Sequence, residues 1–361
     1  MTGAERALAR IDEGAIERNC RRLLDLTADG VDLCAVVKAD GYGHGAVPAA
    51  RAALRGGASW LAVATAAEAR HLREHEIEGR LLVMGALTRT ELRTAVESNA
   101  DVVVWTREEA EAAAALDGAR VHVKLDTGMG RLGTKDVELA RSLLGSHVAG
   151  VMTHFATADE PGDDLFPEQL ERFAGFVEAV RSEVPDAVVH AANSAATFRD
   201  PDAHFDMVRC GVAIYGMDPF QGDPRERGLE PALALESWVA ALRRFESGDG
   251  AGYGRRWTAR EATWVATVPI GYGDGWRRGL SNDCDVLIGG RRYPVVGTVS
   301  MDNITVDVGP DPTVAIGDPV VLIGDQGEER ILAEEVARRL DTINYEVTCG
   351  LSARVRRLHS P

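Results

Sequence analysis

The sequence lacks a run of about 20 apolar residues, the length that a helix needs to cross a bilayer. Its charged first ten residues also lack the apolar stretch of a secretory signal, so we expect neither export nor a membrane partner. Its five cysteines are odd in number and include no CxxC pair. This usage favours reduced thiols in the core of a cytoplasmic protein over a disulfide scaffold or a zinc site.

Positive charge is scarce relative to negative charge, with 40 Lys and Arg against 56 Asp and Glu and a formal net charge of −16. An excess of negative charge opposes sequence-independent binding to the phosphate backbone of nucleic acids, so no nucleic-acid partner is expected. Apolar residues make up 45% and charged residues 27%, as in ordinary globular proteins. The 361 residues exceed what one small core needs, so we expect a large domain and a smaller one.

Short apolar runs alternate with amphipathic segments between residues 30 and 215. Continuous apolar strands that alternate with helices, such as Ala66–Glu76 and Phe166–Val184, indicate a parallel sheet. Eight strand and helix units predict a (β/α)8 TIM barrel, whose chemistry lies on the loops after the strands. The candidate strands are Leu33–Lys38, Trp60–Ala64, Leu81–Met84, Val102–Trp105, Val121–Asp126, Val148–His154, Val188–Asn193 and Val208–Tyr215.

The pattern changes after Tyr215, where a turn-rich stretch from Pro219 to Gly228 marks a boundary near residue 225. The segments beyond it are rich in Val, Ile and Thr and predict a C-terminal, mostly antiparallel β domain. We therefore expect a barrel over residues 13–225 and a β domain over 226–361, to which residues 1–12 also belong. The expected strands are Ala232–Phe245, Thr263–Ile270, Asp285–Ile288, Tyr293–Val296, Ile304–Val308 and Val320–Ile323, with one helix at Ala333–Leu340.

Lys38 closes the first apolar run and precedes a glycine-rich turn that contains Tyr42 and His44. A lysine is almost never buried without a partner, so one at the end of a barrel strand indicates a specific acceptor or a covalent role as a Schiff-base amine. The alternative is a lysine that extends to solvent at the barrel rim.

A GxGxxG pattern, Gly128–Gly133, follows the predicted strand that ends at Asp126. A dinucleotide site also needs an acidic residue about 20 positions later, and none occurs there before Asp159. We therefore interpret the segment as a strand-end loop that presents Arg131.

His71 and His75 form an H-x-x-E-H pattern typical of some zinc proteases. The helix Ala66–Glu76 directs its alanines and Leu72 toward the sheet, which puts both histidines on the solvated face. No metal site is expected here.

Several polar residues and the dipeptide Gly211–Val212 fall at predicted strand ends. In a barrel these positions meet at one mouth, and the polar residues are His154, His190, Ser194 and Arg209. Ser194 and the Gly211–Val212 backbone are suited to hold a phosphate. A phosphate-bearing cofactor with a carbonyl for Lys38 suggests pyridoxal 5′-phosphate.

These motifs resemble those of fold type III pyridoxal-phosphate enzymes, and specifically the alanine racemase family, over essentially the whole chain. The cofactor-lysine signature is Ala-Val-Val-Lys38-Ala-Asp-Gly-Tyr-Gly-His-Gly, and Lys-Leu-Asp-Thr-Gly-Met-Gly-Arg-Leu-Gly, His-Ala-Ala-Asn-Ser and Val-Arg-Cys-Gly follow in the family's order. In the second domain Gly-Tyr253-Gly, Ile-Gly-Tyr272-Gly-Asp-Gly-Trp, Ser-Met301-Asp302 and Asn-Tyr345-Glu continue the resemblance.

The resemblance implies interconversion of L- and D-alanine, for peptidoglycan, by two-base proton transfer on an external aldimine. Lys38 and Tyr253 would be the two catalytic groups. Arg209 would donate a hydrogen bond to the pyridine nitrogen of the cofactor, and His154 would lie beneath the pyridine ring. A phenol has a pKa near 10 in water, so we expect a neighbouring positive charge, from an arginine or a protonated His154, to lower the pKa of Tyr253. The residues implied for the phosphate are Tyr42, Ser194, Gly211, Val212 and Tyr345, and those for the substrate carboxylate are Arg131 and Met301.

The resemblance also implies a homodimer in which the β domain of one subunit completes the site of the other. Lys124 matches a lysine that can be carbamylated and pair with Arg131. The positions implied around the site and its access corridor are Asp159, His190, Tyr272, Arg278, Asp302 and Ile343. Many relatives carry arginine where this chain has Thr298, which leaves serine or another amino acid open as a substrate.

Three alternatives remain. A racemase of broader specificity, for serine or lysine, would keep every motif above. An amino-acid decarboxylase of the same fold would carry a Cys-Glu-Ser-Gly-Asp-like motif, whereas this chain has Phe245-Glu-Ser-Gly-Asp. A non-catalytic pyridoxal-phosphate-binding protein would resemble only the barrel.

Overall fold

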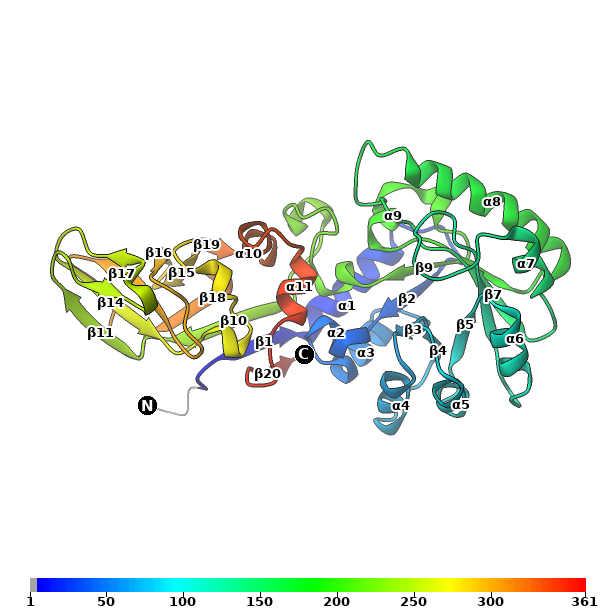
Figure 1. Ribbon diagram of the computed structural model, residues 1–361, viewed down its shortest axis with the longest axis horizontal. Helices are drawn as coiled ribbons and strands as arrows, with labels where there is room; N and C mark the ends of the chain where they lie inside the picture. The colour runs from blue at the N-terminus through cyan, green and yellow to red at the C-terminus, as the bar shows by residue number, and fades with distance from the viewer. Residues whose placement is uncertain (1–4) are drawn as a thin grey trace. The chain divides into compact units, whose positions relative to one another are not determined.

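The eight apolar runs between residues 30 and 215 form a closed parallel barrel in the computed structural model, which describes residues 5–361 (Figure 1). This confirms the predicted fold class. The barrel strands are β2 (Asp32–Val36), β3 (Trp60–Val63), β4 (Arg80–Val83), β5 (Asp101–Val104), β6 (Val121–Lys124), β7 (Val148–Met152), β8 (Val188–His190) and β9 (Met207–Cys210).

The barrel closes because β2 pairs in parallel with both β3 and β9, so that Cys34 lies opposite Trp60 on one side and Arg209 on the other. Inward-facing apolar side chains from alternate strand positions fill part of its interior. They are Cys34, Val36, Trp60, Ala62, Leu82, Val103, Met152 and Met207.

Helices follow the barrel strands, and three of them begin with the same capping box. Thr65, Thr88 and Thr106 each accept a hydrogen bond from the backbone N–H of a glutamate three residues later, whose carboxylate bonds back to the threonine N–H. The helices of this part of the chain are α1 (Glu13–Leu24), α2 (Lys38–Tyr42), α3 (Ala46–Arg55), α4 (Ala66–Glu74), α5 (Arg89–Glu97), α6 (Arg107–Ala114), α7 (Val137–Ser142), α8 (Leu165–Glu183) and α9 (Ser194–Arg199), with the 3-10 turns η1 (Pro201–Ala203) and η2 (Val212–Tyr215).

The chain divides into two compact units, one of residues Ile16–Phe220 and one of Gln221–Pro361 together with the segment that ends at Ala15. The second unit is mostly antiparallel sheet, in the order β11-β14-β17-β16-β15-β18-β10-β1-β20 with β19 paired to β18. Its strands are β1 (Leu8–Asp12), β10 (Leu233–Trp238), β11 (Ala241–Phe245), β12 (Gly250–Ala251), β13 (Trp257–Thr258), β14 (Thr263–Val268), β15 (Asp285–Ile288), β16 (Arg291–Val296), β17 (Ile304–Gly309), β18 (Pro319–Gln326), β19 (Glu329–Ile331) and β20 (Arg356–Ser360). Its helical elements are η3 (Pro224–Arg227), η4 (Tyr253–Arg255), η5 (Tyr272–Asp274), η6 (Arg278–Leu280), α10 (Ala333–Arg339) and α11 (Asn344–Cys349).

The N-terminal strand β1 lies between β10 and β20. Leu8 is opposite Glu236 of antiparallel β10 and Arg356 of parallel β20. Of the residues 1–12 that we assigned to the β domain, residues 1–4 lie outside the described part of the chain.

Several strand boundaries differ from the sequence-based ones, and two of the differences follow from backbone geometry and strand pairing. The predicted strand Leu33–Lys38 ends at Val36, since residues 39–42 take positive φ values. The predicted strand Ala232–Phe245 is two strands, because β10 pairs with β1 and β18 whereas β11 pairs with β14.

Side-chain burial agrees with most of the simpler expectations. Cys20, Cys34, Cys210 and Cys284 are buried, but Cys349 lies exposed at the end of α11 and is not a core residue. His71 on α4 and His75 directly after it are exposed, and no group of three or more potential metal ligands gathers within residues 5–361. In the same range no helix is long and apolar enough to span a membrane.

Candidate active site

A left-handed turn follows β2 and carries Lys38 and Tyr42 at its two ends. Its residues Ala39, Asp40, Gly41 and Tyr42 have φ values of 52°, 52°, 61° and 53°. This conformation costs an L-residue roughly 1–2 kcal/mol, and backbone strain of this kind concentrates at functional sites.

Carboxylates from outside and inside the turn hold it in place. Glu68 Oε1 accepts from the Ala39 N–H at 2.7 Å, and Asp40 Oδ1 accepts from the Ala46 N–H at 2.9 Å. A Cβ on Gly41 would lie 3.3 Å from the nitrogen of Ala46, so a glycine fits the tightest point. The backbone next to Lys38 is therefore fixed by several independent contacts.

Arg209 occupies the centre of the barrel mouth, on β9, with 3% of its surface exposed. Its Nη2 donates to the carbonyl oxygens of Thr153 and Ala191, both at 2.9 Å, and lies 3.2 Å from His154 Nδ1. Its Nη1 donates to His190 Nδ1 at 3.0 Å. None of these bonds uses the Nε–H. Burial lowers the pKa of Arg209 to about 10, which leaves the guanidinium charged at neutral pH.

His154 is neutral at physiological pH. Burial, reinforced by the charge of Arg209 and then of Lys124, holds the pKa of His154 well below its ordinary value. The expectation that a protonated His154 assists Tyr253 is therefore wrong, because the cations around the imidazole repel a further positive charge.

Four of the residues predicted to hold a phosphate lie together, with Tyr42 after β2, Ser194 after β8, and Gly211 and Val212 after β9. Ser194 begins α9, and its Oγ accepts from the backbone N–H groups of Gly211 at 3.1 Å and Ala213 at 3.3 Å. A Cβ on Gly211 would overlap the Tyr42 hydroxyl and lie 2.8 Å from its ring carbon Cζ. Val212 follows directly at the start of η2. Two hydroxyls and adjacent backbone N–H groups are suited to bind a phosphate dianion.

The loop after β6 presents Arg131, as the sequence predicted. Asp126 accepts from the backbone N–H groups of Gly128 and Gly130 at 3.1 Å, and Thr134 N–H donates to the Lys124 carbonyl, also at 3.1 Å. These bonds fold the GxGxxG segment into a closed loop in which Arg131 is exposed.

Lys124 is nearly buried below this loop, with 4% exposure. Burial, followed by the charges of Arg209 and Arg131, lowers the pKa of Lys124 to about 8, and Lys38 contributes in the same direction. The mouth thus collects four cationic side chains and favours anionic ligand groups.

Asp159 lies at the same end of the barrel, in the loop between β7 and α8, and is partly exposed. Arg199 of α9 holds this loop by donating to the carbonyl oxygens of Thr157, Ala158 and Glu160.

In the β unit, three predicted site residues form an exposed surface. Tyr253, Met301 and Tyr272 are 73%, 51% and 42% exposed. The loops of Tyr272 and Met301 are tied together, because the Tyr272 N–H donates to the Ser300 carbonyl at 3.0 Å and the Gly273 N–H donates to the Met301 carbonyl at 2.9 Å. Exposed large side chains grouped in this way are typical of an interaction surface.

Hydrogen bonds to two aspartates also hold the loops of Tyr272 and Met301. Asp302 accepts from Arg354 Nη2 at 2.7 Å, and buried Asp274 accepts from the Gly271 N–H at 2.9 Å. Thr298, assigned to the access corridor by sequence, is instead buried with 4% exposure and bonds to the backbone of Tyr253.

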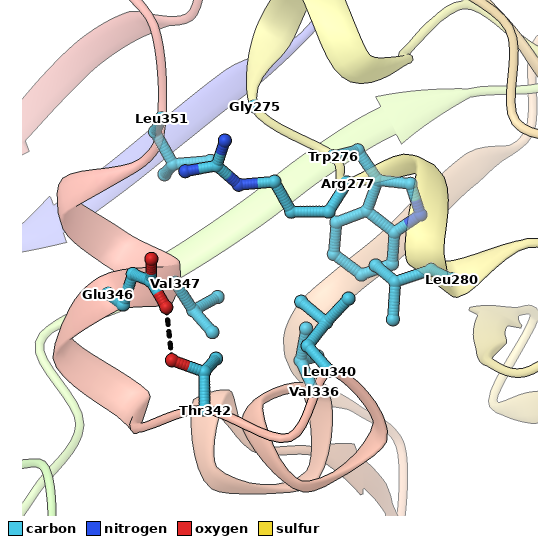
Figure 2. A pocket seen from close by; sticks show the side chains of 10 residues that line it. All are labelled: Gly275, Trp276, Arg277, Leu280, Val336, Leu340, Thr342, Glu346, Val347 and Leu351. Atoms are coloured by element: carbon cyan, nitrogen blue, oxygen red, sulfur yellow. Dashed lines mark hydrogen bonds between the residues drawn. The ribbon is translucent and has the colours of Figure 1, made fainter.

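A cavity of about 300 Å³ lies in the β unit and is lined by Arg277 and Glu346, the chain neighbours of Arg278 and Tyr345 (Figure 2). Tyr345 is on α11 and Arg278 on η6, and neighbours of both residues line the cavity. Ile343, the residue before α11, is 40% exposed. The lining residues are Gly275, Trp276, Arg277, Leu280, Val336, Leu340, Thr342, Glu346, Val347 and Leu351, so none of the predicted site residues is among them.

Sequence reasoning missed three residues that support the barrel mouth. Glu68 was detectable as the N3 residue of a capping box, although its bond to Ala39 was not. Asp101 and His122 stood out only as polar residues within apolar strands.

Both halves of the chain match models of known domain families. Residues 11–219 match "Alanine racemase, N-terminal domain", and residues 232–359 match "Alanine racemase, C-terminal domain".

Similar proteins cover nearly the whole chain. An alanine racemase of Symbiobacterium thermophilum is 42% identical over 374 residues, which span 99% of this chain and 98% of that protein. One of Geobacillus stearothermophilus is also 42% identical, over 97% and 92% of the two chains.

Solved structures agree with these similarities. The crystal structure of alanine racemase from E. faecalis superposes with a TM-score of 0.93 at 36% identity, over 99% of this chain and 98% of that one. The alanine racemase of Bacillus anthracis with bound L-Ala-P superposes with a TM-score of 0.91 at 36% identity, over 100% and 96%.

Proposed function

The chain belongs to the alanine racemase family, and from this premise we propose that it interconverts L- and D-alanine with pyridoxal 5′-phosphate as cofactor. The observation that carries the proposal is the barrel mouth, where a lysine, a buried guanidinium and a hydroxyl-lined anion site lie together. We further propose that the product supplies peptidoglycan synthesis, and that the protein acts in the cytoplasm, which suits its buried thiols.

The residues of the barrel mouth fit this cofactor group by group. Tyr42, Ser194 and the backbone of Gly211 and Val212 would hold the phosphate, and Tyr345 would add a further hydroxyl. Lys38 is the amine for the aldehyde carbon. When bound, pyridoxal phosphate would delocalise the electron pair that remains on the substrate α-carbon after its proton leaves.

Arg209 would hold the ring nitrogen as a donor only. Its pKa of about 10 keeps the guanidinium protonated at neutral pH, and a guanidinium has no acceptor atom. The Nε–H is among the donors that its bonds to His190, His154, Thr153 and Ala191 leave unused. Arg209 therefore orients the ring without giving it a proton, which distinguishes this site from that of a decarboxylase with an acidic residue at this position.

Racemisation needs one proton carrier on each face of the α-carbon. Lys38 would remove or return the proton on the D side, and Tyr253 would do so on the L side. Arg131 and the Met301 N–H would hold the substrate carboxylate, and the charge of Arg131 fits that anion.

We propose that the active form is a homodimer in which Tyr253, Tyr272, Met301 and Asp302 of one copy complete the barrel mouth of the other. The support is the exposed surface formed by Tyr253, Met301 and Tyr272. A dilute, demonstrably monomeric sample should then lose nearly all of its specific activity.

The test is chiral chromatography of pure L-alanine after incubation with the purified protein and pyridoxal phosphate. An approach to equal amounts of the two enantiomers is expected, and absence of D-alanine would reject the proposal. Serine and lysine, run in parallel, determine the specificity.

Two variants test the assigned bases. Tyr253→Phe should lower kcat for L-alanine by about 10²–10⁴-fold while the affinity for pyridoxal phosphate stays within twofold, because only a proton carrier is lost. Lys38→Ala should abolish both activity and the visible band that borohydride removes. Unchanged kinetics in the first variant, or a retained band in the second, would contradict the assignments.

A further inference from the structure

Four ionisable side chains cross the interior of the barrel in a single file. Asp101 of β5, His122 of β6 and His190 of β8 are fully buried, and Arg209 of β9 is 3% exposed. Barrel interiors are ordinarily packed with branched apolar residues, and a buried polar group is costly unless it is hydrogen-bonded. The file therefore needs a physical explanation.

Each member of the file contacts the next. Asp101 Oδ2 is 3.1 Å from His122 Nε2, His122 Nδ1 is 2.7 Å from His190 Nε2, and His190 Nδ1 is 3.0 Å from Arg209 Nη1. The two imidazole rings meet edge to face at 72°. The file thus connects Asp101, at the amino end of β5, to the guanidinium of the candidate active site.

Only one arrangement of protons satisfies all three contacts. A guanidinium can only donate, so His190 Nδ1 must accept and the His190 proton must be on Nε2. That proton is donated to His122 Nδ1, which places the His122 proton on Nε2, facing the Asp101 carboxylate. Both imidazoles are therefore neutral and Asp101 is ionised.

The electrostatics of the file agree with this arrangement. Burial lowers the pKa of His122 and outweighs the opposing effect of Asp101. Burial and then the charge of Arg209 hold the pKa of His190 well below its ordinary value. For Asp101, burial raises the pKa, but the hydrogen bond from neutral His122 together with the charge and hydrogen bond of Arg120 lower it by more, so the net shift is downward.

The acidic end of the file is fixed by two arginines. Arg120 Nε donates to Asp101 Oδ1 at 2.6 Å, and Arg80 Nη2 donates to Oδ2 at 3.0 Å. Arg80 also stacks over the Trp60 ring at 3.8 Å, and the edge of that ring contacts His122 at 5.6 Å between centroids. Asp101 can therefore present only one orientation to His122.

We propose that Asp101 and His122 are positioning residues that lock His190 in its Nε2–H tautomer and thereby hold Arg209 in the orientation that receives the cofactor ring nitrogen. The role of Arg209 toward that nitrogen rests on the proposed function. The tautomer lock itself rests on the contacts of the file. Without it, His190 can place a proton on Nδ1, which faces the N–H of Arg209 and displaces the guanidinium.

The variants are His122→Phe, which keeps an aromatic ring against Trp60 but removes the acceptor of His190, and Asp101→Asn, which removes the anion. Val103→Ala, a buried apolar change two residues from Asp101 on β5, is the matched control for loss of packing. All are studied as the holoenzyme, with the melting temperature measured for each.

The first readout is the nitrogen chemical-shift pattern of the histidine side chains in ¹⁵N-labelled protein. Neutral Nε2–H tautomers are expected for His122 and His190 in the wild type and in Val103→Ala. In His122→Phe and Asp101→Asn the His190 pattern should move toward the Nδ1–H form. A wild-type His190 that is an imidazolium or an Nδ1–H tautomer would overturn the proposal.

The second readout is the split between kcat and KM. Mutation of the outer partners that orient metal-binding histidines typically lowers affinity or activity about 10- to 100-fold. By analogy, kcat should fall by that factor in both file variants. KM for alanine should stay within about twofold, because the file does not contact the substrate carboxylate. A folded variant with an altered tautomer but unchanged kcat and cofactor absorbance would refute the positioning role.

Failure of the proposed function gives a different result. If the wild type binds pyridoxal phosphate but does not racemise alanine, the proposed activity is wrong. The histidine spectra and the shift in the absorbance of the bound cofactor between wild type and variants still decide whether the file positions Arg209.

Discussion

The hydroxyl of Thr298 donates a 2.8 Å hydrogen bond to the backbone carbonyl of Tyr253. A Cβ on the preceding residue, Gly252, would lie 3.0 Å from the Thr298 nitrogen, and Gly252 has a φ of 69°. The loop that carries the exposed Tyr253 ring is thus fixed at its backbone. Thr298 therefore contacts the backbone of the proposed proton carrier directly.

Thr298→Val should loosen this loop. The change keeps the shape of the side chain but leaves the Tyr253 carbonyl without its donor, at a cost of about 1 kcal/mol, or roughly a fivefold fall in kcat. Steady-state kinetics in both directions measure the effect, and Thr298→Ser, which retains the hydroxyl, is the control. Equal kcat values for wild type and Thr298→Val would mean that the bond does not hold the loop.

Gly211→Ala should weaken binding of pyridoxal phosphate by at least tenfold, because the new Cβ would overlap the Tyr42 hydroxyl. Equilibrium titration of the apoenzyme measures the change in Kd. In a Tyr42→Ala background both the hydroxyl and the ring carbons that the new Cβ would meet are absent, so the same change should cost clearly less there. Additive effects of the two substitutions would show that the clash is not the cause.

Lys124 should react with carbon dioxide in a pH-dependent way. With a pKa of about 8, its amine is mostly protonated at pH 7 and mostly neutral above pH 8. Only the neutral amine attacks carbon dioxide, forming an N–C bond and releasing a proton, and the nearby Arg131 would pair with the carbamate.

The measurement is ¹³C NMR with labelled carbon dioxide at a fixed dissolved concentration. A carbamate signal should grow between pH 7 and pH 9 and vanish in Lys124→Ala. The sequence has only three lysines, and exposed Lys135 on the same loop supplies the control, since Lys135→Ala should retain the signal. A signal that survives Lys124→Ala would assign the reaction elsewhere.

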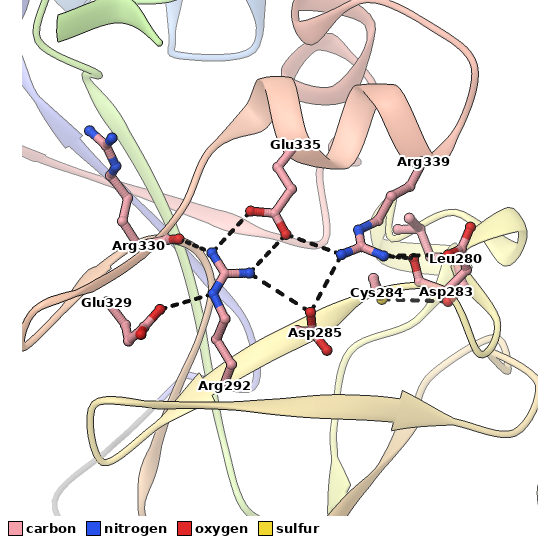
Figure 3. Close-up of polar contacts among 9 residues, drawn as sticks. All are labelled: Leu280, Asp283, Cys284, Asp285, Arg292, Glu329, Arg330, Glu335 and Arg339. Carbon is pink, nitrogen blue, oxygen red and sulfur yellow. Dashed lines mark hydrogen bonds and ion pairs between the residues drawn. The ribbon is translucent and has the colours of Figure 1, made fainter. Parts of the chain in front are cut away.

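Glu335→Gln should destabilise the β unit by about 1 kcal/mol at neutral pH. Glu335 accepts from Arg292 Nη1 at 2.8 Å and Nη2 at 3.0 Å, and from Arg339 at 3.4 Å (Figure 3). Burial raises the pKa of Glu335, but the hydrogen bonds and charge of Arg292 and Arg339 lower it by more, so the net shift is downward.

A lowered folded-state pKa gives stability that is present above the unfolded pKa of about 4.3 and is lost as the pH falls through the folded value. The melting temperatures of wild type and Glu335→Gln should therefore differ at pH 7 and converge at acid pH. Glu328→Gln, an exposed change nearby, should have little effect at either pH. Parallel curves for Glu335→Gln and wild type would contradict the assignment.

The barrel could be predicted from the sequence because its strands are continuous apolar runs separated by helical segments. The capping boxes of α4, α5 and α6 were likewise visible as local spacings. The ends of β2 and β9 were not, since the backbone leaves the strand before the apolar run is over.

Features that depend on contacts between residues far apart along the chain could not be predicted from the sequence. His154 is kept neutral by burial and by cations from three separate segments, after β2, around the end of β6 and on β9, and the partners of Thr298 and His122 are fixed only when the chain has folded. His122 and His190 are 68 residues apart, and they meet only when β6 and β8 pair on either side of β7, where Gly150 leaves room between them. A single sequence shows such residues as isolated polar positions.

The left-handed turn after β2 has a consequence for how far Lys38 can move. The backbone from residue 39 to residue 42 is held by Glu68, by Asp40 and by its own unusual dihedral angles. Any displacement of the Lys38 amine during a catalytic cycle must therefore come from rotation about the bonds of its own side chain. The distance over which this amine can move is set by the four methylene groups of its side chain, because the backbone that carries them is fixed.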